Sequence, residues 1–156
     1  MNRRRCLAVV LPVLPWLMLS ACGGNNGTSP LELTHLATSD LGPVPARTLV
    51  SRTAAAWAAF WDAHPYPRGA VPAPPVDFER HAVAGVFAGS KPRCQRLEIA
   101  SGERQDGVVT LRWRIVTFGQ STPSSCIGSD FFDLNLADMV LIPADVQDVR
   151  FLEEGI

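Results

Sequence analysis

The sequence predicts an α+β fold with one N-terminal amphipathic helix packed on an antiparallel β-sheet or sandwich of about five to six strands. Two observations predict it. Aromatic residues recur at helical spacing within an alanine-rich stretch, and downstream of it the apolar period changes to two. One helix followed by a run of strands is typical of a helix that covers a sheet. A β-sandwich that carries a peripheral helix is the alternative.

The helix is predicted over residues 54–64, where alanine-rich sequence favours helix formation. Ser51 or Thr53 can cap its start. Four residues share one face by their spacing: Trp57, Phe60, Trp61 and His64. We interpret this stripe as core rather than as a ligand site. Pro65 ends the helix, and the proline-rich stretch 65–75 is predicted to be a rigid surface loop.

Strands are predicted where apolar residues alternate with polar ones or form a short run. In chain order these segments are 47–50, 82–88, 94–100, 109–115, 139–142 and 146–152. Asp106 and Gly107 form a hairpin turn signal before the fourth. Arg112 and Arg114 share one face of that strand, with Arg96 close in the preceding one. A basic strip could meet an acidic partner, but we favour an ordinary solvated face.

The first thirty residues have the layout of an export signal. Three arginines at 3–5 precede an apolar stretch at 6–19 that is short and interrupted by prolines, unlike a membrane span. Residues 19–23, Leu-Ser-Ala-Cys-Gly, look like a lipobox, the recognition sequence of lipoprotein signal peptidase. We therefore predict that residues 1–21 are a lipoprotein signal peptide and that lipid is attached to Cys22. An ordinary secretory signal cut nearby is the alternative.

This signal predicts a location and a division of the chain. The protein is expected to be lipid-anchored in the cell envelope. Gly23 rather than aspartate follows the cysteine, so the periplasmic face of the outer membrane is expected in a Gram-negative cell. Residues 22–32 are predicted to be a flexible tether, and residues 33–156 a single globular domain. Loss of three arginines and no acid lowers the formal net charge from −1 to about −4, which disfavours a nucleic-acid partner.

The mature chain keeps two cysteines besides Cys22, namely Cys94 and Cys126. An even pair in an oxidising compartment favours a disulfide between them. A metal pair is the alternative, although two isolated cysteines lack the C-x-x-C geometry of zinc sites.

The order of these segments resembles the C-terminal domain of PrcB-like, protease-complex-stabilising lipoproteins. The residues that carry the resemblance are the Trp-bearing helix at 57–61, Val-Asp-Phe at 76–78, the apolar strand ending in glycine at 83–89, Ser-Lys-Pro at 90–92, and Val-Leu-Ile-Pro at 140–143. It covers roughly residues 47–152. The family commonly has Gly-Tyr after its Gly-x-x-Pro turn, whereas this chain has Arg93-Cys94-Gln95. The resemblance implies a non-enzymatic module that binds or stabilises another exported protein, a protease in the named case.

No catalytic or cofactor site is predicted. The five residues that could be drawn as a metal site, Asp62, His64, Asp77, Glu79 and His81, lack ligand spacing. The serines at 121, 124 and 125 lack the G-x-S-x-G frame of a hydrolase nucleophile, which leaves an envelope hydrolase as a distant third hypothesis. Loops on a rigid scaffold favour binding. We therefore predict partner contacts at Lys91, Arg93, Gln120, Ser124 and Ser125. A protease inhibitor that presents disulfide-linked loops is the alternative function.

Overall fold

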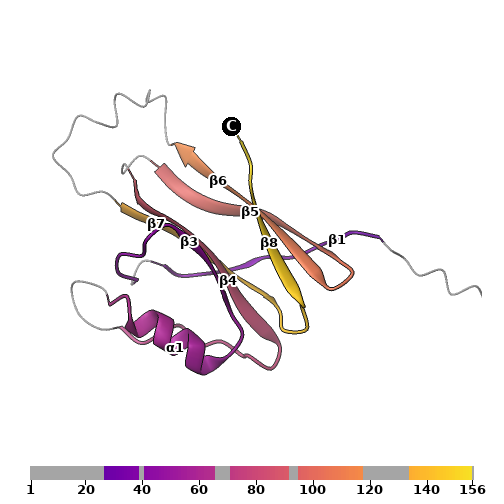
Figure 1. The fold of residues 1–156 in the computed structure, drawn as a ribbon, viewed down its shortest axis with the longest axis horizontal. Coiled ribbons are helices and arrows are strands. Elements are labelled where there is room, and N and C mark those ends of the chain that lie inside the picture. Colours follow the sequence, from indigo (N-terminus) through magenta and orange to yellow (C-terminus); the bar gives the residue numbers. More distant parts are fainter. Residues whose placement is uncertain (1–26, 39–40, 66–70, 92–94, 118–133, 156) are drawn as a thin grey trace, which may run out of the picture.

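The computed structural model describes residues 27–38, 41–65, 71–91, 95–117 and 134–155. Within these residues lie eight strands and one helix (Figure 1). In chain order they are β1 (Ser29–Pro30), β2 (Thr34–Leu36), β3 (Arg47–Ser51), α1 (Ala54–Asp62), β4 (His81–Lys91), β5 (Gln95–Gln105), β6 (Val108–Thr117), β7 (Leu134–Pro143) and β8 (Asp148–Glu153).

The strands form two four-stranded sheets, which we name sheet A, with the order β1-β5-β6-β8, and sheet B, with the order β2-β7-β4-β3. The described part is therefore mostly β with one helix, and the α+β class is confirmed in this broad sense. The finer prediction differs in three respects. Eight strands replace five to six, three strands precede the helix along the chain, and β8 runs parallel to β6. β6 and β8 are parallel because the chain leaves sheet A after β6, runs through β7 in sheet B and then returns to sheet A. The chain reverses direction twice on this path, so β8 has the direction of β6.

Two apolar layers hold the architecture together. The first lies between the sheets, and its buried residues are Ala82, Ala84, Val86, Leu97, Ile99, Val109, Leu111, Leu136, Val140, Ile142 and Val146. The second lies between sheet B and α1, and its buried residues are Leu41, Val44, Trp57, Phe60, Trp61, Val83, Phe87 and Met139. Successive residues of β4 alternate between the layers, as the two faces of a strand require. The molecule thus has sheet A, sheet B and the helix as three layers (Figure 1).

The helix forms where the sequence predicts it. The Thr53 side chain caps it by accepting a hydrogen bond from Ala56 N at 3.1 Å. The predicted aromatic stripe is buried against sheet B, and His64 continues it with its ring 4.8 Å from that of Phe60. The indole nitrogens of Trp57 and Trp61 donate to Pro74 O at 2.9 Å and to Val71 O at 2.7 Å. These two bonds fasten the described end of the proline-rich loop to the helix.

The central strands also match their predicted segments, although each is longer than predicted. Leu97 and Ile99 of β5 face the core, as do Val109 and Leu111 of β6. The hairpin turn between them is confirmed, because Asp106 and Gly107 have φ values of 50° and 79°. Positive φ at both central residues is what a two-residue type I′ turn needs.

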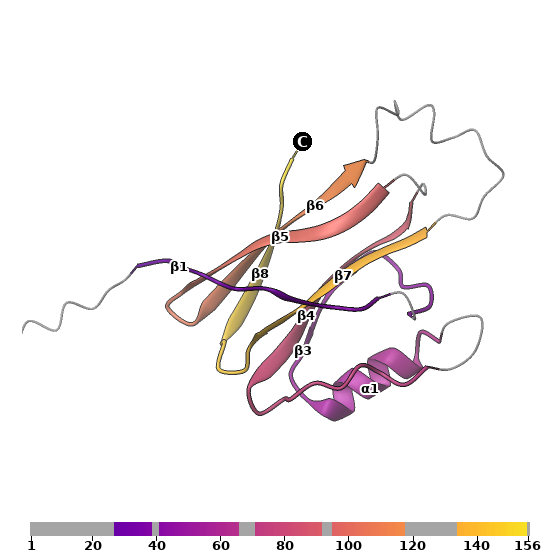
Figure 2. The ribbon, with the colours of Figure 1, turned by 180° about the vertical axis from the view of Figure 1, so that it is seen from behind.

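The ordered domain begins before the predicted boundary at residue 33. Ser29 and Pro30 pair with β5, and Leu31 N donates to Gly102 O at 2.8 Å. The chain then passes to sheet B, where β2 pairs with β7. Leu31 and Leu33 are partly buried against the inter-sheet layer between these two contacts, so residues 29–33 lie against the sheets. Figure 2 shows this strap, residues 29–36, crossing the molecule from β1 toward β7.

Candidate functional site

Only one of the predicted site residues falls within the described part of the chain. Lys91 is the last residue of β4, where it lies opposite Leu134 in the register of β7. The remaining predicted residues lie outside the described residues: Cys22, Cys94, Cys126, Arg93, Gln120, Ser124 and Ser125. The lipid site and the disulfide therefore stay predictions from the sequence.

Lys91 borders a groove of about 360 Å³ where the two sheets come apart at one side. The residues that line it are Ala46, Arg47, Thr48, Val86, Phe87, Ala88, Lys91, Trp113, Ile115 and Glu153. They come from β3 and β4 of sheet B, from β6 and β8 of sheet A, and from the residue before β3. Apolar side chains form most of the lining, and three charged groups belong to the groove. We call this surface the β3–β8 groove. Its volume lies at the lower end of the range for ligand pockets, ~300–1,000 Å³, so it suits a few side chains rather than a large ligand.

The groove exists because β3 and β8 are the last strands of their sheets. Just after the opposite end of β3, the Arg52 guanidinium donates to the carbonyl oxygens of Val146 at 2.5 Å and Gln147 at 3.3 Å, in the connection between β7 and β8. These bonds tie the end of β3 to the connection that leads into sheet A. Arg47, a lining residue, has its guanidinium carbon 5.3 Å from the centre of the Phe60 ring, a cation–π contact with the helix layer.

A small ionic cluster lies beyond the groove on sheet A. Glu98 accepts a bond of 2.7 Å from Arg114 Nε, and Arg96 lies 2.8 Å from its second oxygen. The hydrogen bond from Arg114, with the positive charge of Arg96, holds the pKa of the Glu98 carboxyl below its ordinary value, although partial burial opposes the shift. The arginines at 96 and 114 thus share a carboxylate. This arrangement fits the favoured interpretation of a solvated charged face.

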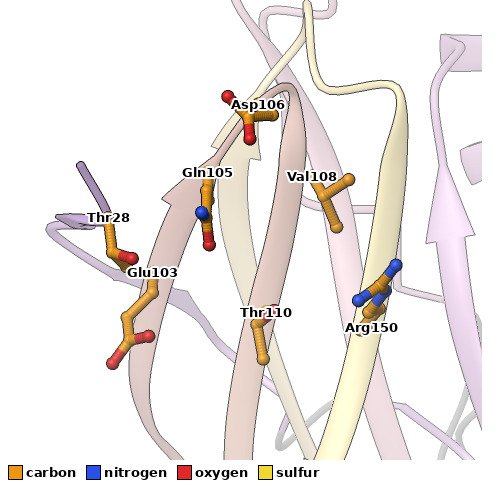
Figure 3. Close-up of a pocket in the computed structure, with 7 residues that line it drawn as sticks. All are labelled: Thr28, Glu103, Gln105, Asp106, Val108, Thr110 and Arg150. Carbon is orange, nitrogen blue, oxygen red and sulfur yellow. The ribbon is translucent and has the colours of Figure 1, made fainter. Parts of the chain in front are cut away.

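A second hollow lies near the β5–β6 hairpin (Figure 3). Thr28, Glu103, Gln105, Asp106, Val108, Thr110 and Arg150 line it. Figure 3 shows Glu103 and Arg150 on opposite sides of Thr110. Neither a nucleophile–base pair nor an ion pair is formed among these side chains, and the hollow is polar. It therefore gives less support for a site than the β3–β8 groove does.

A buried carboxylate is the feature that sequence reasoning missed. Asp138 of β7 is 8% exposed, and its Oδ2 accepts a hydrogen bond from Ile99 N of β5 at 2.7 Å. Its Oδ1 lies 2.9 Å from His35 Nδ1 on the strap. The carboxylate thus links sheet B to sheet A on the side opposite the groove. Among the described residues, no three histidine, cysteine or acidic side chains group closely enough to hold a metal ion.

Comparisons with models of protein families, with curated proteins and with solved structures find no match. The resemblance to PrcB-like domains therefore stays an expectation from the sequence. Within the described ranges no helix has the length and apolar character needed to cross a membrane.

Proposed function

We propose that this chain is a non-catalytic, lipid-anchored domain of the cell envelope that binds another exported protein through the β3–β8 groove. The groove carries the proposal. It is lined by Trp113, Ile115 and other apolar groups, and it includes Lys91, which the sequence had independently suggested as a contact residue. An apolar floor with charged groups at its margin is typical of surfaces that bind protein segments.

The lipobox supports the anchored location. One acyl chain binds a membrane only marginally, whereas two or more hold a protein firmly. Lipid on Cys22 would therefore keep the domain and its partner at the membrane surface.

Replacing Cys22 by serine should abolish acylation and leave the signal peptide, residues 1–21, uncleaved. The substitution removes the thiol that accepts the lipid and leaves the described domain unchanged. The mass of each form, purified from the cells that produce it, would report the acyl chains and the cleavage. A Ser20→Ala variant serves as the matched control, because it changes the signal without removing the acceptor. A serine variant that is still acylated, or that is cleaved like the unchanged protein, would contradict lipid anchoring through Cys22.

A photo-crosslinking amino acid at Thr48 should capture the partner in living cells, whereas the same amino acid at Ala58 should not. Thr48 lines the groove, and Ala58 is also solvent-exposed but lies on α1, in another layer. The Ala46→Trp substitution should lower the yield at Thr48 about tenfold, which corresponds to about 1.4 kcal/mol, because the indole would occupy the groove.

Ala58→Trp is the control for that substitution, since it adds the same exposed indole away from the groove. Equal crosslinking at Thr48 and Ala58, or no effect of Ala46→Trp, would contradict a binding role for the groove. If the captured protein is a protease, its activity and lifetime with and without this chain separate inhibition from stabilisation.

A further inference from the structure

The two sides of the sandwich at which the sheets end differ in what covers them. On the β5–β7 side, the strap adds β1 to sheet A and β2 to sheet B and partly buries Leu31 and Leu33 between them. On the other side, sheet A ends at β8 and sheet B ends at β3, and the groove lies between them. An extended segment with apolar residues, the strap, therefore covers one side of this fold. On the other side, the β3–β8 groove leaves an apolar surface that a similar segment could cover.

Among the described strands β8 is the last of sheet A, so its outer edge presents backbone groups to such a segment. Glu154 N donates to Trp113 O at 2.8 Å, so the even-numbered residues of β8 direct their backbone groups at β6. Alternate residues of a strand direct theirs to opposite sides, so Phe151 and Glu153 present N–H and C=O groups to the free edge. The N–H of Val149 is already bonded to Asp148 Oδ1 at 2.9 Å. Strand addition would thus use the C-terminal half of β8, which is the half beside the groove.

We propose that an extended segment of the partner protein adds to the free edge of β8 as a further strand of sheet A, with alternate apolar side chains in the β3–β8 groove. This inference rests on the proposed function and names the mode of binding. Backbone hydrogen bonds supply affinity in such strand addition, and pockets for alternate side chains supply specificity.

The charged residues that line the groove indicate which side chains the bound segment of the partner carries. Among the described residues that line the groove, Arg47 and Lys91 are cations and Glu153 is the single acid. The segment therefore carries a carboxylate beside its alternating apolar residues. A second copy of this chain fits less well, because Asp148, Arg150 and Glu153 place charges along β8. Charged edges of this kind discourage pairing between like strands.

The test uses the full chain in detergent and a defined probe, a seven-residue peptide in which valine and threonine alternate before a terminal glutamate. We expect saturable shifts of the backbone amide signals of Phe151 and Glu153 and of the Trp113 indole signal in NMR spectra. A peptide of the same sequence with N-methyl groups on alternate amides, facing β8, should bind at least tenfold more weakly. Lys91→Glu should weaken binding of the glutamate peptide and strengthen binding of its lysine-ended counterpart.

Three results would overturn the inference. They are equal binding of the plain and N-methylated peptides, no shift at Phe151 and Glu153 at millimolar peptide, and a concentration-dependent dimer that protects the same amides, which would make a second copy the occupant. These failures are distinguishable from failure of the proposed function. If a partner crosslinks at Thr48 but N-methylation does not weaken peptide binding, the proposed protein binding stands and only strand addition is contradicted.

Discussion

Replacing Trp61 by alanine should lower the free energy of unfolding by about 3–5 kcal/mol, the usual cost of truncating a buried tryptophan. Trp61 is 3% exposed in the layer between α1 and sheet B, and its ring centre lies 5.3 Å from that of Trp57. The change removes this packing and also the hydrogen bond to Val71 O. Because whole domains are stable by only about 5–15 kcal/mol, the variant should be close to unfolding at ambient temperature.

Urea unfolding followed by circular dichroism measures this effect. Trp61→Phe is the matched control. It keeps an aromatic ring but loses the indole donor, so its cost should be about 1–2 kcal/mol. Leu152→Ala should change little, because that side chain is 44% exposed. A cost for Trp61→Ala below that of Trp61→Phe would show that the helix is not held to sheet B by this layer.

The parts of the fold that the sequence predicts are those with a strong local signal. The helix has both a cap and a stripe of aromatic residues, and β6 alternates between Val109 and Ile115 without interruption. The strap shows the limit of such reasoning. β1 and β2 have two and three residues, too few for a period to be read, and their structure depends on pairing with β5 and β7.

The groove was not predicted, although one of its lining residues, Lys91, is among the partner contacts that the sequence suggests. Alternation in β6 correctly indicates that Trp113 and Ile115 face inward, and an inward apolar residue is most simply interpreted as core. Periodicity gives the face of a strand but not whether the opposing sheet extends far enough to cover it. That coverage depends on where β3 and β8 end their sheets, which is a property of the whole topology.

Asp138 is a further case in which tertiary contacts decide the role of a residue. A lone aspartate in the stretch 135–138 carries no sequence signal of burial, and yet its side chain is 12% exposed while that of His35 is 48% exposed. Its bond to Ile99 N joins the sheets at a β5 position beside an irregularity in the pairing with β6. Buried backbone N–H groups require acceptors, and this side chain supplies one from the opposite sheet.

Asp138→Ala should therefore cost about 2–3 kcal/mol, because it leaves the Ile99 N–H buried without its charged acceptor. Asp138→Asn should cost about 1 kcal/mol, since its amide oxygen can still accept that bond. His35→Ala should cost less than about 1 kcal/mol, because a hydrogen bond to a half-exposed side chain contributes little. Unfolding in urea gives the three values, and hydrogen exchange at Ile99 reports the bond directly. A cost for His35→Ala equal to that for Asp138→Ala would assign the stabilisation to the contact with the strap instead of to the link between the sheets.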